Sequence, residues 1–130
     1  MPIFRLQKMA IRLIANIPRK ATSMTYCKQK IILRLPDIYK QSTGIFIYKF
    51  KNGLSPNIFS DFFIINNEIH RYTTRGGNKL RISFTITNTA SKFVKKTGVT
   101  FWNELEDNKT KNLKIGSFKS QVKSYIISTY

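Results

Sequence analysis

Apolar residues recur at steps of three and four in three stretches of this 130-residue chain, and this spacing restricts its fold more than any other feature. In a helix such residues form one stripe, which has to be buried against another element. The stretches are residues 3–17, 36–50 and 117–127. We therefore predict a mainly α chain of roughly four to six helices, several of them short. It forms a single small domain over residues 1–130, or a fragment of a larger one.

Prolines and glycines predict where these helices begin and end. Pro18 ends the first helix, because proline lacks an N–H and clashes with the preceding turn. Pro36 begins the second, with Asp37 where a helix N-terminus favours negative charge. Gly53 after Asn52 is a typical helix stop. Short helices are also expected over residues 26–33 and 56–63.

Residues 81–87 have a different period, with Ile82, Phe84 and Ile86 at alternate positions. This alternation is typical of a strand. We predict one small β hairpin around residues 81–96, with residues 91–96 as the second strand, although a helix start there is an alternative. Gly98 then breaks the chain. The predicted sub-parts are a helical part (residues 3–65), a basic loop and hairpin (66–97), and a Trp-containing turn with a C-terminal helix (98–130).

The apolar stripes also predict the core. The side chains expected there are those of Ile14, Phe46, Phe101, Trp102 and Phe118.

The chain has 23 Lys and Arg against 6 Asp and Glu, a formal net charge of +17. Such an excess favours a polyanionic partner, RNA or DNA ahead of a membrane surface. The alternative is that the cations only solvate the surface. We expect the cations to gather on one surface and to bind phosphates without reading sequence, with Tyr72 stacking on an unpaired base. The predicted nucleic-acid-binding residues are Arg5, Lys8, Arg12, Arg71, Tyr72, Arg75, Lys79, Arg81, Lys119 and Lys123.

Catalytic groups are scarce. The single cysteine, Cys27, and the single histidine, His70, would form a nucleophile–base pair only if the fold brought them together. Three acids lie close in sequence at Glu104, Glu106 and Asp107, and an exposed turn accounts for them better than an acid–base pair. We therefore predict no catalytic residue, no metal site, no cofactor and no small-molecule substrate.

The N-terminal sequence has no signal-peptide pattern, because cations interrupt its apolar stretches at Arg5, Lys8 and Arg12. No apolar run is long enough for a membrane-spanning helix. The sequence therefore predicts an intracellular protein, in the nucleus or the cytoplasm, that is neither secreted nor bound to a membrane.

Five segments occur in the order and spacing of one known family. The chain resembles the C-terminal, post-polymerase region of non-LTR (LINE-type, jockey-like) retrotransposon reverse transcriptases, over about residues 6–130. Leu6–Ile14 is similar to its LQxxAxRxI segment and Tyr48–Pro56 to YKxxNGxxP. The other three are His70–Arg75 (HxYxTR), Gly98–Leu105 (GxxxWNxL) and Ser117–Tyr125 (SFKxxxKxY).

Two differences from the family bear on function. Many members have Leu-Pro after the Trp-Asn pair, where this chain has Leu105-Glu106. The YxDD-type aspartates that hold two metal ions in the family's polymerase are absent from this sequence. The resemblance therefore implies a non-catalytic C-terminal part of an RNA-directed DNA polymerase that engages RNA or DNA, with the polymerase body as a further partner. The alternatives are a structural docking module and a non-functional transposon relic.

Overall fold

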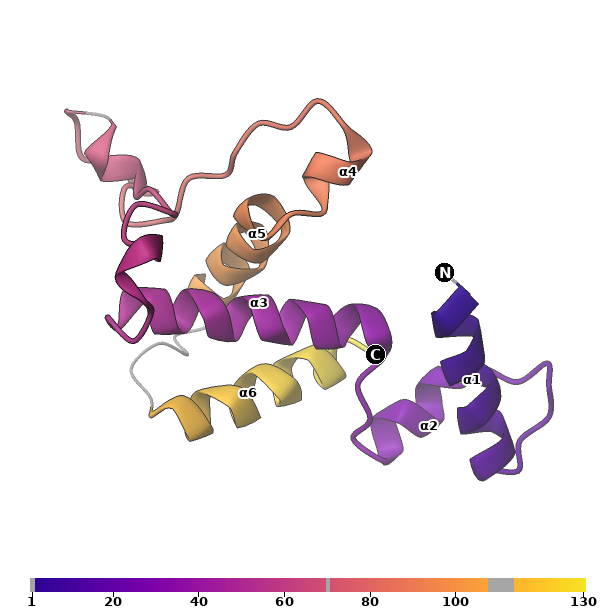
Figure 1. Cartoon of the computed structure of the whole chain (residues 1–130). Helices are drawn as coiled ribbons and strands as arrows, with labels where there is room; N and C mark the ends of the chain where they lie inside the picture. Colours follow the sequence, from indigo (N-terminus) through magenta and orange to yellow (C-terminus); the bar gives the residue numbers. More distant parts are fainter. Residues whose placement is uncertain (1, 70, 108–113) are drawn as a thin grey trace.

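The computed structural model of the protein describes residues 2–69, 71–107 and 114–130, without the side chains of residues 106 and 107. The prediction of a mainly α chain is confirmed (Figure 1). The α-helices are α1 (Pro2–Ile14), α2 (Met24–Gln29), α3 (Leu35–Lys51), α4 (Asn88–Ser91), α5 (Val94–Asp107) and α6 (Ile115–Ser128), and the 3-10 turns are η1 (Asn57–Phe59) and η2 (Asn66–Glu68).

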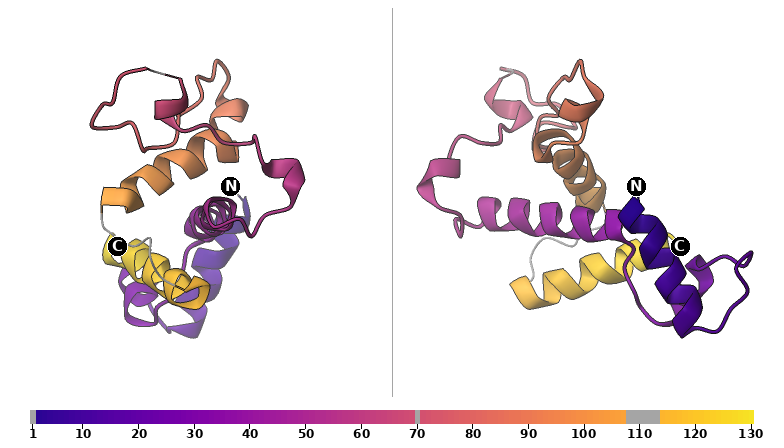
Figure 2. Two further views of the ribbon diagram at one scale, coloured as in Figure 1. Left: turned by 90° about the vertical axis from the view of Figure 1, so that its left-hand side faces the viewer. Right: turned by 45° about the vertical axis from the view of Figure 1, so that its right-hand side comes forward.

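The core lies between α3, α5 and α6. Figure 2 (left) looks along α3 and shows α5 above it and α6 below it. Phe118 of α6 is completely buried between the other two helices, because its ring stacks on Tyr48 at 4.4 Å between centroids and lies 5.8 Å from the ring of Trp102. Phe101 and Trp102 are buried as predicted. Phe46, also predicted as core, is half-buried and packs against this cluster.

Two glycines let α3 and α5 pack closely. A Cβ atom at Gly98 would lie 3.1 Å from the Cβ of Thr43 and 3.3 Å from the Cδ1 of Ile47. A Cβ atom at Gly44 would lie 3.1 Å from the Phe101 ring. The prediction that Gly98 breaks the chain is wrong, since α5 runs through it and the expected Trp-containing turn is helical. Packing against α3 explains a glycine inside this helix.

In the part of the chain that the structure describes, α1, α2 and α3 are each followed by a residue with positive φ. Gly53 has this conformation (φ 68°) after α3, as its sequence predicts, and the N–H of Leu54 donates to the carbonyl of Lys49 (2.8 Å). Asn16 (φ 50°) ends α1 in the same way, so this helix stops before the expected limit at Pro18. After α2 the residue is Ile31 (φ 54°), a conformation that strains a β-branched side chain.

The predicted β hairpin is wrong. Residues 81–85 have no regular secondary structure, and the described residues contain an isolated bridge between Ile65 and Leu80 and no strand. The expected second strand is helical, because Thr87 caps α4 by accepting from the N–H of Ala90 (3.1 Å) and α5 begins at Val94. The alternative prediction, a helix start within residues 91–96, is confirmed, because α5 begins at Val94.

The predicted helix over residues 56–63 is reduced to the single 3-10 turn η1. Phe59 at its end and the aromatic residues that follow form a cluster of edge-to-face rings on α3. Phe46 lies 5.2 Å from Phe59 and 6.0 Å from Phe62, between ring centroids. This cluster covers one end of the core and gives residues 59–63 their irregular course.

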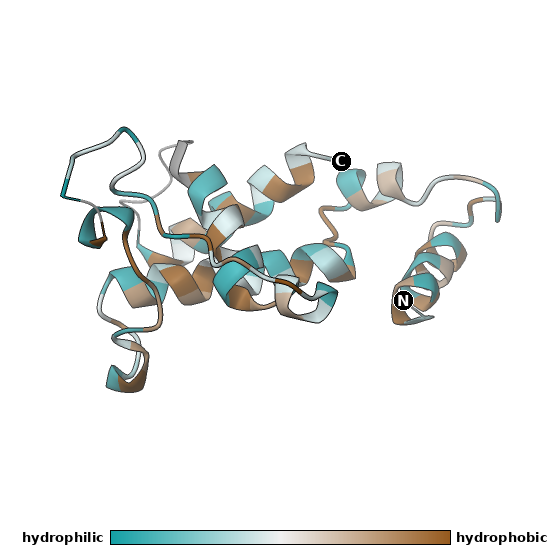
Figure 3. Cartoon of the chain, turned by 90° about the horizontal axis from the view of Figure 1, so that it is seen from above, coloured by the Kyte–Doolittle hydropathy of each residue, from teal (hydrophilic) through white to brown (hydrophobic). Residues whose placement is uncertain are grey.

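The first helix lies apart from this core, as Figure 3 shows with hydrophobic residues along its length. Ile14, predicted as a core residue, is 76% exposed, and Leu13 is 80% exposed. The opposite side of α1 makes the contacts instead. Ile11 is buried there, and the Gln7 side chain binds the backbone on both sides of Arg34, donating to the carbonyl of Leu33 (3.1 Å) and accepting from the N–H of Leu35 (2.9 Å).

None of the helices in the described ranges has both the length and the apolar character needed to cross a membrane.

Candidate nucleic-acid interface

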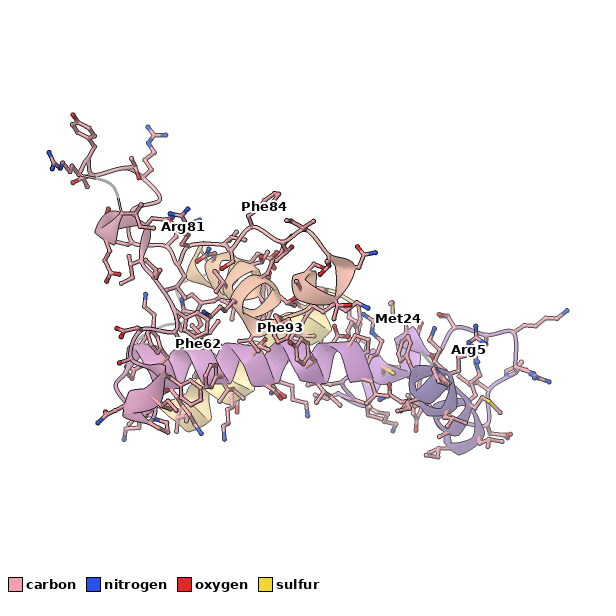
Figure 4. All side chains as sticks on the ribbon, turned by 45° about the horizontal axis from the view of Figure 1, so that its top comes forward. Arg5, Met24, Phe62, Arg81, Phe84 and Phe93 are labelled. Carbon is pink, nitrogen blue, oxygen red and sulfur yellow. The ribbon has the colours of Figure 1, made fainter. Side chains whose placement is uncertain are left out.

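The predicted binding residues lie on three separate parts of the molecule (Figures 1 and 4). The first part is α1 with Arg5, Lys8 and Arg12. The second is the basic loop, which we define as residues 66–81, and it projects from the opposite end of the molecule. The third is α6, which lies on the other side of α3 from the basic loop. The expectation of one basic surface is therefore wrong for the described residues, because the core helices separate the three groups.

Backbone hydrogen bonds close the base of the basic loop. The N–H of Arg81 donates to the carbonyl of Ile64 (2.8 Å), and the N–H of Asn66 donates to the carbonyl of Lys79 (3.0 Å). A further bond from the N–H of Asn67 to the carbonyl of Gly77 (2.9 Å) narrows the loop. These bonds leave residues 71–75 at its tip. The loop predicted from its polar sequence is therefore held together at its base by backbone hydrogen bonds.

The tip of the basic loop presents the predicted contact residues to solvent. Arg71 and Arg75 are exposed, and Tyr72 is 83% exposed. Arg81 is exposed at the base and Lys79 is half-buried beside it. An exposed Tyr ring between two Arg side chains has the chemistry to stack on a base while the guanidinium groups bind phosphates.

Asn103 holds the base of the basic loop on α5. Its side-chain amide donates to the carbonyl of Leu80 (3.0 Å) and accepts from the N–H of the same residue (3.2 Å), as a neighbouring strand would. Leu80 is itself buried. Asn103 was not predicted as a site residue, and the sequence signal that could have found it is the Trp-Asn pair of the GxxxWNxL segment.

The cations of α1 are partly occupied within the chain. The Nε of Arg12 donates to the carbonyl of Ala21 (3.1 Å), and the ammonium of Lys8 lies 4.3 Å from the centroid of the Phe4 ring. Arg5 is exposed (Figure 4). Arg12 and Lys8 therefore stabilise the local structure in addition to any contact that they make with a ligand.

The predicted cations of α6 lie on its outer side. Lys119 is exposed and Lys123 is half-buried, whereas Phe118 and Val122 of the same helix are buried. The stripe predicted for this helix is therefore confirmed, with the apolar side turned inward and the lysines outward.

Asp37 belongs to a partly buried cluster of polar side chains. Asp37 is buried and accepts from the Nε of Arg34 (2.9 Å) and the hydroxyl of Tyr130 (2.8 Å). Burial is the main cause that raises the pKa of Tyr130, and donation to Asp37 raises it further. The pKa of Arg34 is also raised, because its hydrogen bonds to Asp37 and Tyr130 outweigh the effect of burial. This cluster joins the C-terminal residue to the start of α3.

The remaining candidates for chemistry are Cys27 and Glu104, which belong to different helices. Cys27 is buried, and burial raises the pKa of its thiol, which makes it less reactive. Its possible partner His70 lies outside the described residues, as do Lys109 and Lys111. Glu104 is exposed but belongs to α5 rather than to the expected turn. Over the described ranges no three His, Cys, Asp or Glu side chains come together as a metal site would require.

Comparisons with family models, with curated proteins and with solved structures find no match to this chain.

Proposed function

We propose that this chain is a non-catalytic C-terminal part of a mobile-element RNA-directed DNA polymerase and that its basic loop binds the phosphates of RNA or DNA without sequence preference. The resemblance supports the first half of this proposal. The observation that carries the second half is the basic loop, where Arg71, Tyr72 and Arg75 are exposed on a closed turn away from the rest of the fold.

Charge arithmetic supports the same proposal. With 23 cations and 6 acids, at least 17 cations have no acid of this chain to pair with one-to-one. Phosphate binding by such cations releases counterions, so the affinity depends strongly on salt. No side chain of the basic loop reads bases through a recognised motif, so the binding distinguishes sequences poorly.

A salt titration tests this proposal. Binding of a fluorescent oligouridylate and of a DNA duplex is measured by anisotropy from about 50 to 500 mM salt. We expect Arg71→Gln with Arg75→Gln to weaken binding and to reduce the slope of log affinity against log salt by about 2. The matched control is Arg19→Gln with Lys20→Gln, which removes equal charge from an exposed turn beside α1. An equal loss in both variants, or binding that does not change with salt, contradicts the role of the basic loop.

The exposed stripe of α1 favours a second candidate function, docking on a larger protein body. The stripe consists of large apolar side chains that are 51–80% exposed, and beside it Met9, Leu13 and Ile17 line an open hollow of about 420 Å³. Contiguous apolar surface of this kind marks an interaction site. The members of the stripe are Ile3, Leu6, Met9, Leu13 and Ile14.

The polymerase body of the parent element is the partner that the resemblance implies for this stripe. Titration calorimetry with the polymerase domain of a jockey-like element tests it. Leu6→Ser with Leu13→Ser should abolish binding, whereas the variant of Arg71 and Arg75 should leave it unchanged. Absence of binding by the unmodified chain contradicts docking, and absence of both activities favours the relic.

A further inference from the structure

We propose that residues 82–86 are one strand of a sheet whose other strand comes from a partner protein, an extended segment in which apolar and acidic residues alternate. This inference does not depend on the proposed function. It begins from the same alternation that made the sequence predict a hairpin, and from the finding that no strand of the described chain pairs with it.

One side of this segment is apolar and exposed. Ile86 and Phe84 are 90% and 91% exposed and Ile82 is 47% exposed, and Figure 4 shows Phe84 pointing away from the ribbon. The residues between them face the other way, because Ser83 and Thr85 are half-buried and the Thr85 hydroxyl accepts from the Lys96 ammonium (2.9 Å). The side chains thus alternate as in a half-buried strand.

The backbone N–H and C=O groups of this segment are free to pair with another strand. Within the described part of the chain, no backbone hydrogen bond joins an N–H or carbonyl of residues 82–86 to any other residue. The residues just before it are paired, Arg81 with Ile64 and Leu80 with the Asn103 amide. A row of unpaired N–H and C=O groups is a template for another strand.

The chain starts this sheet but cannot continue it. The bridge between Ile65 and Leu80 would extend to residues 82–86 only if the residues before Ile64 ran alongside them. Instead Phe63 is buried and Phe62 packs on Phe46. On the C-terminal side α4 and α5 take up the residues that a hairpin would need. The described residues therefore offer this segment no neighbouring strand, which supports a strand supplied by a partner.

The cations beside this segment indicate that the partner strand carries acidic residues. The inner side of the segment is lined by cations, since Lys96 binds Thr85, and Lys95 and Arg81 line the same small hollow as Ser83. An incoming strand that places acids on this side and apolar residues beside Phe84 satisfies both faces. A second copy of this chain is disfavoured, because each copy carries a net charge of +17.

Nucleic acid fits this segment less well than a strand does. Two of the three exposed side chains, Ile82 and Ile86, are aliphatic and offer no ring for a base to stack on. Unpaired amides can bind a phosphate as well as a strand, but the regular alternation of apolar and polar side chains is a feature that only a strand uses.

The test uses the full chain and a capped peptide of about eight residues that alternates valine and glutamate. Hydrogen–deuterium exchange is followed residue by residue with up to about 1 mM peptide. We expect slower exchange of amides within residues 82–86, and weaker protection at high salt. A peptide of the same composition with its valines and glutamates in separate blocks should give no protection, because it cannot place its acids and apolar residues on opposite sides.

Matched variants separate this site from general apolar binding. Phe84→Ser with Ile86→Ser should weaken peptide binding about tenfold by removing cross-strand contacts. Both residues are exposed, so the fold should persist, and circular dichroism checks this. The control is Ile58→Ser on η1, which removes an apolar side chain that is 85% exposed elsewhere on the surface.

Four results overturn the proposal. The first is no protection of residues 82–86 by the alternating peptide at the highest concentration, and the second is an equal effect of Ile58→Ser. The third is protection that grows with protein concentration in the absence of peptide, which assigns the edge to a second copy. The fourth is protection by oligouridylate in place of peptide, which assigns it to nucleic acid.

Discussion

Helices α1 and α6 have the same kind of apolar stripe and opposite surroundings. In α6 the stripe is buried, with Phe118 and Val122 inaccessible to solvent, because α3 and α5 lie against it. In α1 the stripe faces solvent at Leu6 and Leu13, and the helix is attached by its other side. The comparison shows that an apolar stripe predicts a helix and an apolar face but does not say whether this chain provides what covers it.

The attachment of α1 combines the buried Ile11 with hydrogen bonds from two polar side chains. The Gln7 side chain donates to the carbonyl of Leu33 and accepts from the N–H of Leu35. The Arg12 side chain donates to the carbonyl of Ala21, in the turn that follows the helix. Such contacts position a helix while leaving its apolar stripe available to another body. In the core, by contrast, the contacts are those of close-packed rings and aliphatic side chains.

The largest difference between the two helices is expected on truncation of a stripe residue. Phe118→Ala should lower the free energy of unfolding by about 3–5 kcal/mol, because it opens a cavity in the core. Leu13→Ala should change it by no more than about 0.5 kcal/mol, because Leu13 is 80% exposed. Urea denaturation followed by circular dichroism measures both values.

A large loss of stability in Leu13→Ala would break the comparison, since it would mean that the stripe of α1 is covered in solution. Measurements at several protein concentrations serve as the control. If the loss appears only at high concentration, self-association covers the stripe; otherwise it packs within one chain.

A smaller effect is expected for the attachment of α1. Gln7→Ala removes two hydrogen bonds to the backbone of residues 33 and 35, and should cost about 1–3 kcal/mol. Because the core helices do not depend on Gln7, exchange of amides should accelerate in α1 and remain slow in α3 and α6. Gln29→Ala, at an exposed position of α2, is the control. Equal acceleration in all helices would show that α1 and the core unfold as one unit.

The smallest effect is expected at the residue with positive φ that follows α2. Ile31 has a positive φ after α2, where α1 has Asn16 and α3 has Gly53. Ile31→Asn should raise the midpoint of unfolding, by up to about 1 kcal/mol in free energy, because Asn tolerates this conformation better than a β-branched residue. Thermal melting measures the change. Ile38→Asn, at an exposed position in α3 with ordinary helical φ, should give no such gain.

The successes of the sequence analysis are those that rest on local rules. Gly53 ends α3 and Pro36 lies in its first turn, because each residue has a narrow range of backbone conformations. The apolar stripe of α6 followed from helical period alone. The basic loop was predicted as a loop, and its arginines are exposed, as charged side chains usually are.

The errors concern contacts between distant residues. Gly98 looked like a break because glycine is a poor helix former, and only Thr43 and Ile47 of the neighbouring helix explain its position. Asn103 had no predicted role, because its function depends on the backbone of Leu80, which lies 23 residues away in the sequence and next to it in the fold. The three cationic groups looked like one surface because sequence spacing carries no information on which side of α3 each group lies.

The amino-acid sequence by itself determined the helical character of the chain, the ends of α3, the apolar face of α6 and the excess of positive charge, since these follow from the conformational range, the polarity and the charge of the residues. The tertiary structure alone decided that the stripe of α1 faces solvent and that residues 82–86 lack a neighbouring strand. The physical reason is that burial and strand pairing are properties of two surfaces, and a sequence pattern describes only one of them.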